Sequence, residues 1–320
     1  MRETFIGETI YQKRLEQGMT QEKLCEGLCD PSTLSRIESG KQAPCRNVAK
    51  VLLLRLNVPP DRYYTYLTAS EAEAEALQTE IDSCASRFRQ SLGEKRRQAR
   101  LDALERLDKL ETITEAGDNI TRQYILAARA SLGTESGPYG FKTKLDMLLK
   151  AIRLTVPGFD AEALAGRLYS IDEAEIISQI AGAYSDAGQH EKAAGLFNQL
   201  LTYVRERDQD VTHPSRQLSP ATLNYARELC LAGRYQEALE TAELGRQTCL
   251  NYGFCQALPG LLAVMAECRC ALGDREQGRE LFCQAYYLYK ETGHANGLAR
   301  VEEAAKERLG PEFPLQGVLV

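Results

Sequence analysis

Apolar residues recur at helical spacing through the first sixty-odd residues, in short stretches separated by polar turns. Gly18 and Gly40 follow two of these stretches, and Pro31 stands at the expected first position of another, which are stop and start signals for helices. The pattern predicts a compact five-helix unit. Its expected helices are Thr4–Gln17, 20–27, 31–39, 45–56 and a fifth from Pro59-Pro60 that carries Tyr63, Tyr64, Tyr66 and Leu67.

A second pattern begins after a segment in which Glu and Ala alternate, Glu71 to Leu77. This composition favours helix but offers almost no apolar face, so we expect a helical linker over residues 69–77 and a domain boundary there. The expected domains are residues 1–68, the linker 69–77, a larger domain 78–309 and a tail 310–320.

The larger domain repeats a helix, a glycine turn and a second helix. The clearest copy turns at Gly188, similar copies turn at Gly233 and Gly273, which are spaced by 45 and 40 residues, and weaker ones turn at Gly133 and Gly93. We therefore expect about five helix pairs. The spacing of small and large residues resembles the tetratricopeptide repeat, although the period is longer than the consensus of about 34 residues. The predicted fold is all-α, with a right-handed solenoid whose inner face is concave, and residues 205–220, including His213, are expected to form a long loop.

Composition and charge exclude several classes of protein. Residues 1–68 hold ten Lys and Arg against eight Asp and Glu, net +2, and the remaining residues hold 29 against 37, net −8. A mildly basic head permits contact with nucleic acid without proving it. No apolar run approaches the roughly 18 residues of a membrane span, so we expect a cytoplasmic protein without membrane contact.

The sequence gives no sign of enzyme chemistry. It contains no nucleotide-binding glycine motif and no nucleophile motif, so we expect no catalytic site and no cofactor. The ten cysteines read as reduced thiols. Cys249, Cys255, Cys268, Cys270 and Cys283 lack both CxxC spacing and a neighbouring His pair, so structural thiols are favoured over zinc.

One charged pair stands out in the head. Ile6, Ile10 and Arg14 fall on one helical stripe, and Glu38 lies on the apolar stripe of the third expected helix. A buried arginine needs a partner, so we expect a structural ion pair between Arg14 and Glu38. Two independently solvated charges are the alternative.

Residues Ile6 to Asn57 resemble the helix-turn-helix of phage-repressor-like (XRE-type) domains, on the evidence of Arg14, Thr20-Gln21, Leu24, Leu34 to Glu38 and Ser39-Gly40-Lys41. The turn Cys29-Asp30 departs from the pattern, since Cys29 replaces the usual glycine. In that family the third helix lies in the major groove. The resemblance implies a double-stranded DNA operator as partner, contacted by Gln21, Ser32, Thr33, Ser35, Arg36 and Lys41.

Together, the head and the repeats resemble the Rgg, PlcR and PrgX class of cytoplasmic regulators, whose members bind short signalling peptides in the concave groove and act as homodimers. This implies quorum sensing and a peptide site on the first helix of each pair, where the inward offsets hold Gln123, Ser178, Gln179, Asp186, Asn224, Arg227 and Glu267. Solvated helix positions are the alternative for each of them. A second function class also stays open, a protein-interaction scaffold or partner-inhibiting regulator with an accessory head.

Overall fold

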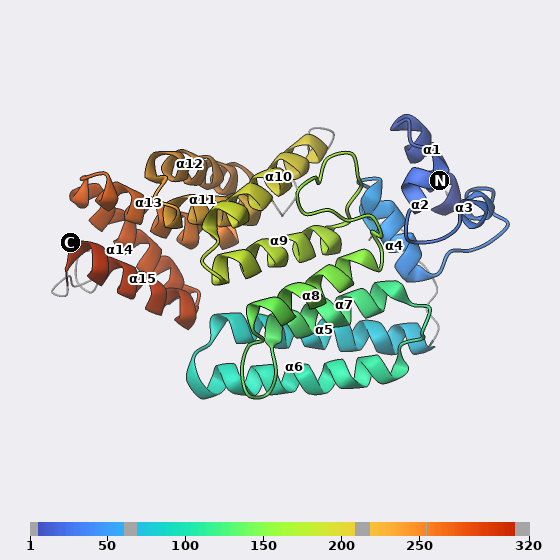
Figure 1. Ribbon diagram of the computed structural model, residues 1–320, viewed down its shortest axis with the longest axis horizontal. Helices are drawn as coiled ribbons and strands as arrows, with labels where there is room; N and C mark the ends of the chain where they lie inside the picture. Colours follow the sequence, from blue (N-terminus) through green and yellow to red (C-terminus); the bar gives the residue numbers. More distant parts are fainter. Residues whose placement is uncertain (1–5, 61–68, 209–217, 254, 311–320) are drawn as a thin grey trace. The chain divides into compact units, whose positions relative to one another are not determined.

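The computed structural model describes residues 6–60, 69–208, 218–253 and 255–310, and within these the regular structure is helical apart from one isolated bridge between Thr134 and Gly137 (Figure 1). The all-α prediction is confirmed. No helix of the described residues is long and apolar enough to cross a membrane.

The head begins with four short helices, α1 (Ile6–Glu16), α2 (Gln21–Cys25), α3 (Pro31–Glu38) and α4 (Arg46–Arg55). Thr20 caps α2, because its hydroxyl accepts a hydrogen bond from the Lys23 amide at 3.2 Å. Pro31 stands at the start of α3, where its missing N–H costs nothing. The fifth expected helix falls largely on residues 61–68, outside the described residues.

The core of the head consists of apolar side chains from all four helices. They are fully or almost fully buried and comprise Ile10, Leu24, Cys25, Leu34, Ile37, Leu52, Leu53 and Leu56. Because these residues recur at spacings of three and four, each helix turns one stripe inward.

Helix α5 (Ala69–Gln90) includes the whole of the expected linker, which is therefore the first part of a long helix. The chain then continues as α6 (Gly93–Ile113), α7 (Asn119–Leu132), α8 (Phe141–Arg153), α9 (Ile171–Asp186), α10 (His190–Asp208), α11 (Leu218–Leu231), α12 (Tyr235–Tyr252), the short η2 (Cys255–Ala257), α13 (Leu258–Ala271), α14 (Arg275–Glu291) and α15 (Ala295–Leu309).

The turns between paired helices lie at the predicted glycines. Gly188, Gly233 and Gly273 have φ angles of +73°, +78° and +98°, in the left-handed region that glycine tolerates best. The prediction for residues 205–220 was wrong at both ends, because α10 continues to Asp208 and α11 begins at Leu218. His213 lies outside the described residues.

The chain forms two compact units, and their boundary cuts through α5, α6 and α9. The first unit contains residues 1–83 and 102–180, so the head packs with the first repeats. The second contains residues 84–101 and 181–320.

In the second unit, successive helices α10 to α15 pack on one another around one apolar core. Small residues allow this close packing: a Cβ added at Gly245 would lie 2.8 Å from Leu261 Cδ2, and one added at Gly278 would lie 2.3 Å from Cys270 Sγ.

Candidate nucleic-acid interface

Helix α3 separates its apolar side from its polar side. Leu34 and Ile37 are buried in the head's core, whereas Ser32, Ser35 and Arg36 are exposed. Thr33 is half-buried, and Lys41, three residues after the helix, is exposed. Five of the six residues expected to contact DNA therefore stand on or just after α3, and four of these five are exposed.

An ion pair fixes α3 against α1. Arg14 Nε donates to Glu38 Oε1 at 2.6 Å and Arg14 Nη2 donates to Glu38 Oε2 at 2.9 Å, so the two side chains meet in the bidentate geometry typical of Arg and carboxylate. Both side chains are largely buried, at 8% and 4% exposed. The hydrogen bond from Glu38 raises the pKa of Arg14. Such a pair contributes more to the orientation of the two helices than to net stability.

Gln21 takes part in the same network. Its amide nitrogen donates to Glu38 Oε2 at 2.6 Å, which holds the half-buried side chain of Gln21 at the interface of α2 and α3. The sequence placed Gln21 at a DNA phosphate. In the structure its amide N–H is already used, and its role in this state is to support α3.

A second buried ion pair connects the head to the repeats within the first unit, and the sequence reasoning missed it. Arg55 in α4 and Glu173 in α9 are each 1% exposed, and Arg55 Nη2 donates to Glu173 Oε1 at 3.2 Å. Arg55 also donates to the carbonyl oxygens of Leu24 at 3.0 Å and Glu26 at 2.7 Å, and to that of Thr155 at 3.2 Å. One guanidinium therefore bridges α2, α4 and the segment between α8 and α9.

The carboxylate of Glu173 is also fully engaged. Oε1 accepts from the Thr155 hydroxyl at 2.6 Å, and Oε2 accepts from the Ser170 amide at 2.6 Å. Thr155 Oγ1 in turn accepts from the Gln123 amide at 2.6 Å. These buried groups satisfy one another, which makes the network rigid.

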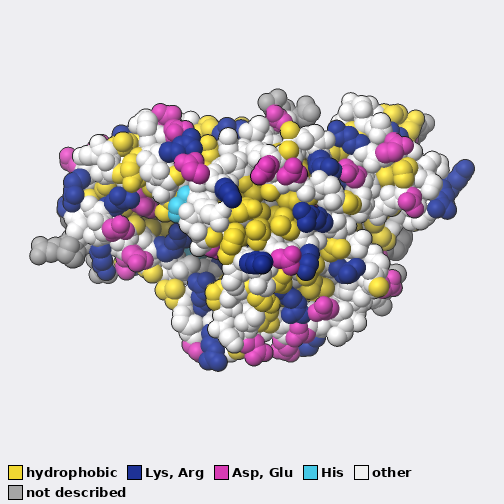
Figure 2. Space-filling model, viewed as in Figure 1, with side chains coloured by type: hydrophobic (Ala, Val, Ile, Leu, Met, Phe, Trp, Pro, Cys, Tyr) yellow, Lys and Arg dark blue, Asp and Glu magenta, His cyan; other side chains and the backbone are white. Residues whose placement is uncertain are grey.

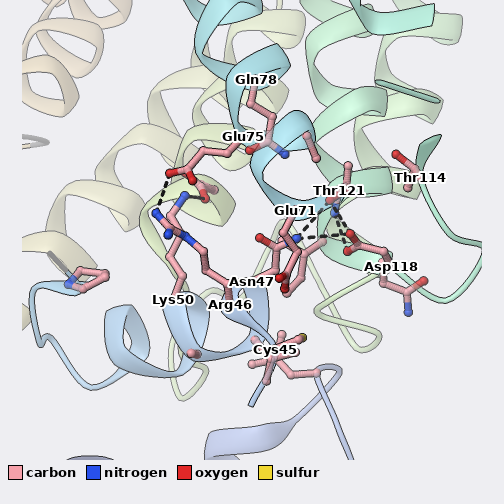
Figure 3. A pocket seen from close by; sticks show the side chains of 18 of the residues that line it. Cys45, Arg46, Asn47, Lys50, Glu71, Glu75, Gln78, Thr114, Asp118 and Thr121 are labelled. Atoms are coloured by element: carbon pink, nitrogen blue, oxygen red, sulfur yellow. Dashed lines mark hydrogen bonds and ion pairs between the residues drawn. The ribbon is translucent and has the colours of Figure 1, made fainter. Parts of the chain in front are cut away.

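A cavity of about 1040 Å³ lies beside this network, lined by α4, α5 and the segment leading into α7 (Figure 3). Its charged groups are paired. Arg46 contacts Glu75 at 2.6 Å, and Lys50 contacts Asp172 at 3.2 Å. Asn47 donates to both Asp118 and Thr121 at 3.2 Å, as Figure 3 shows. Since both cations already face a carboxylate, the cavity does not attract an anion, and these contacts reinforce the attachment of α4 to the repeats.

The residues expected to contact a peptide divide between the two units. Gln123 is only 4% exposed, and its amide donates to the Ala151 carbonyl at 3.1 Å as well as to Thr155. It is a core residue, contrary to the expectation of an inward-facing position, because α8 packs over that side of α7. Ser178 and Gln179 on α9 are half-buried in the first unit.

The other four belong to the second unit, where they lie on α9, α11 and α13: Asp186, Asn224, Arg227 and Glu267. Arg227 and Glu267 influence one another's charge, together with Arg300 on α15. Burial lowers the pKa of Arg227, and repulsion from Arg300 lowers it further. Burial raises the pKa of Glu267. The first helices of three successive pairs thus bring charges of both signs together.

Charge on the surface is mixed. Figure 2 shows basic and acidic side chains interspersed over the face in view, with apolar side chains gathered near its middle. A partner of this protein is therefore recognised by local groups and not by a broad field of one sign.

Comparison with known proteins identifies the head. A helix-turn-helix family model matches residues 10–63, which cover α2, α3 and α4. No protein with a curated description matches the chain in sequence.

Among solved structures, the chain is similar to PlcR from Bacillus thuringiensis in complex with the peptide PapR7 and DNA, with 18% identity, a TM-score of 0.58, and coverage of 94% of this chain and 98% of PlcR. Apo PlcR matches with 18% identity, a TM-score of 0.55, and coverage of 92% and 98%. Apo ComR from Streptococcus vestibularis has 14% identity, a TM-score of 0.48, and coverage of 95% and 97%.

The chain is thus a helix-turn-helix protein with a helical-repeat domain. Over nearly its whole length its fold is the one seen in PlcR. At 18% identity this likeness establishes the fold alone.

Proposed function

We propose that the chain is a cytoplasmic transcription regulator that binds operator DNA through α3 as a homodimer and responds to a short peptide bound by its repeats. The observation that carries the DNA-binding part is the polar face of α3, with Ser32, Ser35 and Arg36 exposed on a helix held in place by the Arg14–Glu38 pair. A rigid helix with short polar side chains and one arginine suits the major groove.

The residues of this face take different roles in the proposal. Arg36 reads a base edge, since a guanidinium pairs bidentately with guanine O6 and N7. Ser32, Thr33 and Ser35 contact base edges or flanking phosphates, and Lys41 contacts the backbone. Gln21 orients α3 through Glu38.

The ligand part of the proposal is supported by the charged cluster of the second unit. Arg227 has a single carboxylate neighbour in the described residues, Glu228, at 3.8 Å, which is too far for a hydrogen bond. Glu228 itself is fully buried and contacts His190 Nδ1 at 3.1 Å. A peptide carboxylate would complete the coordination of Arg227, and the half-buried amide of Asn224 suits a peptide backbone. The solved PlcR complex contains a peptide and DNA.

The DNA-binding test begins with the full chain and a pool of random duplexes. Sequences retained by the chain are then used in gel shifts at several salt concentrations, where affinity should fall steeply with salt. Arg36→Ala should lose about 1–3 kcal/mol of binding to the selected sequence and much less on random DNA. Arg153→Ala, which removes an exposed arginine from α8, is the charge-matched control and should bind normally.

Failure to select any duplex at low salt would contradict DNA binding. Equal losses for Arg36→Ala on selected and random duplexes would refute base readout by Arg36. The ligand part is tested separately with a pool of synthetic heptapeptides, from which bound members are identified by mass spectrometry. Arg227→Gln should lose those that Arg246→Gln on α12 retains, and a pool in which no peptide binds the native chain would contradict the peptide proposal.

A further inference from the structure

A groove in the second unit runs between α12 and α14, with α13 as its floor. Its volume is about 610 Å³. Leu239 and Leu244 of α12, Leu281 of α14 and Met265 of α13 give it an apolar lining. Leu244 is 43% exposed, so part of this lining faces solvent. Amide side chains stand at its edges, Gln236 and Gln247 on α12 and Gln277 on α14.

The floor of the groove holds an arginine with an unused donor. Within the described part of the chain, Arg269 Nε is buried and has no hydrogen-bond partner. The nearby Glu243 does not supply one, because its Oε1 already accepts from Arg246 Nη2 at 2.8 Å, Arg246 Nε at 3.3 Å and Gln247 Nε2 at 3.3 Å. A buried donor without a partner is costly, which points to an acceptor that the described residues do not provide.

The last described helix ends at one mouth of this groove. Arg275, the first residue of α14, donates to the Leu309 carbonyl at 3.1 Å. Arg308 lies over the ring of Tyr235, the first residue of α12, at 5.8 Å. Since Gln236 and Gln277 line the groove one and two residues further along these helices, the chain leaves α15 where the groove begins.

The ten residues that follow, Pro311 to Val320, lie outside the described residues and have a composition that matches the groove. Glu312 is the one charged residue among them, and Phe313, Leu315, Val318, Leu319 and Val320 are apolar. Pro311 and Pro314 disfavour helix. Ten extended residues span up to about 33 Å. The groove extends only about 16 Å along α12 from Gln236 to Gln247, taking 1.5 Å per helical residue.

We propose that residues 312–320 bind in this groove of their own chain, with the Glu312 carboxylate accepting from Arg269 and the apolar side chains covering Leu239, Leu244 and Met265. The segment supplies the acceptor that Arg269 lacks and removes exposed apolar surface from solvent. Because it is tethered at Leu309, its effective concentration at the groove is high, so a modest intrinsic affinity is enough to keep it bound. This site is separate from the proposed DNA and peptide sites.

The chain has no tryptophan, which allows a single reporter. In full-length Phe313→Trp, the tryptophan should emit at short wavelength and resist quenching by acrylamide. Adding Leu244→Asp should shift the emission to the red and expose the tryptophan to quencher. Leu250→Asp is the matched control, because Leu250 is 60% exposed on the same helix and does not line the groove, and it should leave the spectrum unchanged.

Charge exchange tests the polar contact. Arg269→Glu and Glu312→Arg should each release the reporter, and the double variant should restore the short-wavelength emission. A tryptophan that is solvated in the native background, or that responds equally to Leu244→Asp and Leu250→Asp, would overturn the proposal. Emission that changes with protein concentration would also overturn it, because it would assign the groove to the tail of a second copy.

Discussion

The buried pair Arg55–Glu173 gives the sharpest test of how the head is held. Glu173→Gln keeps the size of the side chain but removes its charge. Arg55 would then stay buried with only neutral acceptors, namely the carbonyl groups of Leu24, Glu26 and Thr155 and the new amide. Removing one partner of a buried ion pair typically costs about 3–5 kcal/mol, since the other charge is left uncompensated.

Asp172→Asn is the control, because Asp172 precedes Glu173 in the first turn of α9 and the two share the same helix-dipole environment. Asp172 pairs with Lys50 at 3.2 Å, but these two side chains are 49% and 48% exposed. An exposed pair of this kind is worth about 0–1 kcal/mol. The two neighbouring carboxylates should therefore differ severalfold in their effect.

Urea unfolding of the full chain, followed by far-ultraviolet circular dichroism, measures the difference. The midpoint should fall clearly in Glu173→Gln and stay nearly constant in Asp172→Asn. Replacing both partners with apolar residues, Arg55→Met with Glu173→Leu, should recover much of the loss, because no buried charge remains. Equal midpoints for the two single variants would refute the reasoning that burial decides the contribution of each pair.

Two further predictions follow from the head. Gly27→Ala should destabilise the protein well beyond Gly18→Ala, because both glycines have positive φ, but a Cβ at Gly27 would lie 2.0 Å from the Thr155 carbonyl oxygen whereas one at Gly18 meets nothing within 4 Å; urea midpoints compare them, and similar losses would mean that backbone strain of about 1–3 kcal/mol explains both. Burial raises the pKa of Cys25 from 9.0 to about 11, so the stability that its protonated thiol contributes is complete below pH 9 and is lost as pH rises through 11. Mass spectrometry should accordingly show iodoacetamide labelling of the exposed Cys45 before Cys25 at mildly alkaline pH, and the reverse order would contradict this account.

The periodicity of the sequence was enough to predict the helices of the head and the glycine turns of the repeats. It also predicted Arg14–Glu38, because both residues stand on apolar stripes of helices whose arrangement is known once the motif is recognised. Arg55 carries the same signal, since it follows the apolar run Val51–Leu54. Its partner, however, lies 118 residues away and only the folded chain brings it near.

The sequence alone therefore determined which segments are helical and which side of α3 remains polar, because these depend on residues three and four positions apart. The tertiary structure decided the rest. Gln123 became a core residue when α8 packed over it, and Gln21 became a support for α3 when Glu38 took its amide. Long-range packing also placed the end of α15 beside a groove whose floor holds an unpartnered Arg269 donor. Such outcomes depend on which helices meet, and local spacing carries no information about residues that approach one another only after folding.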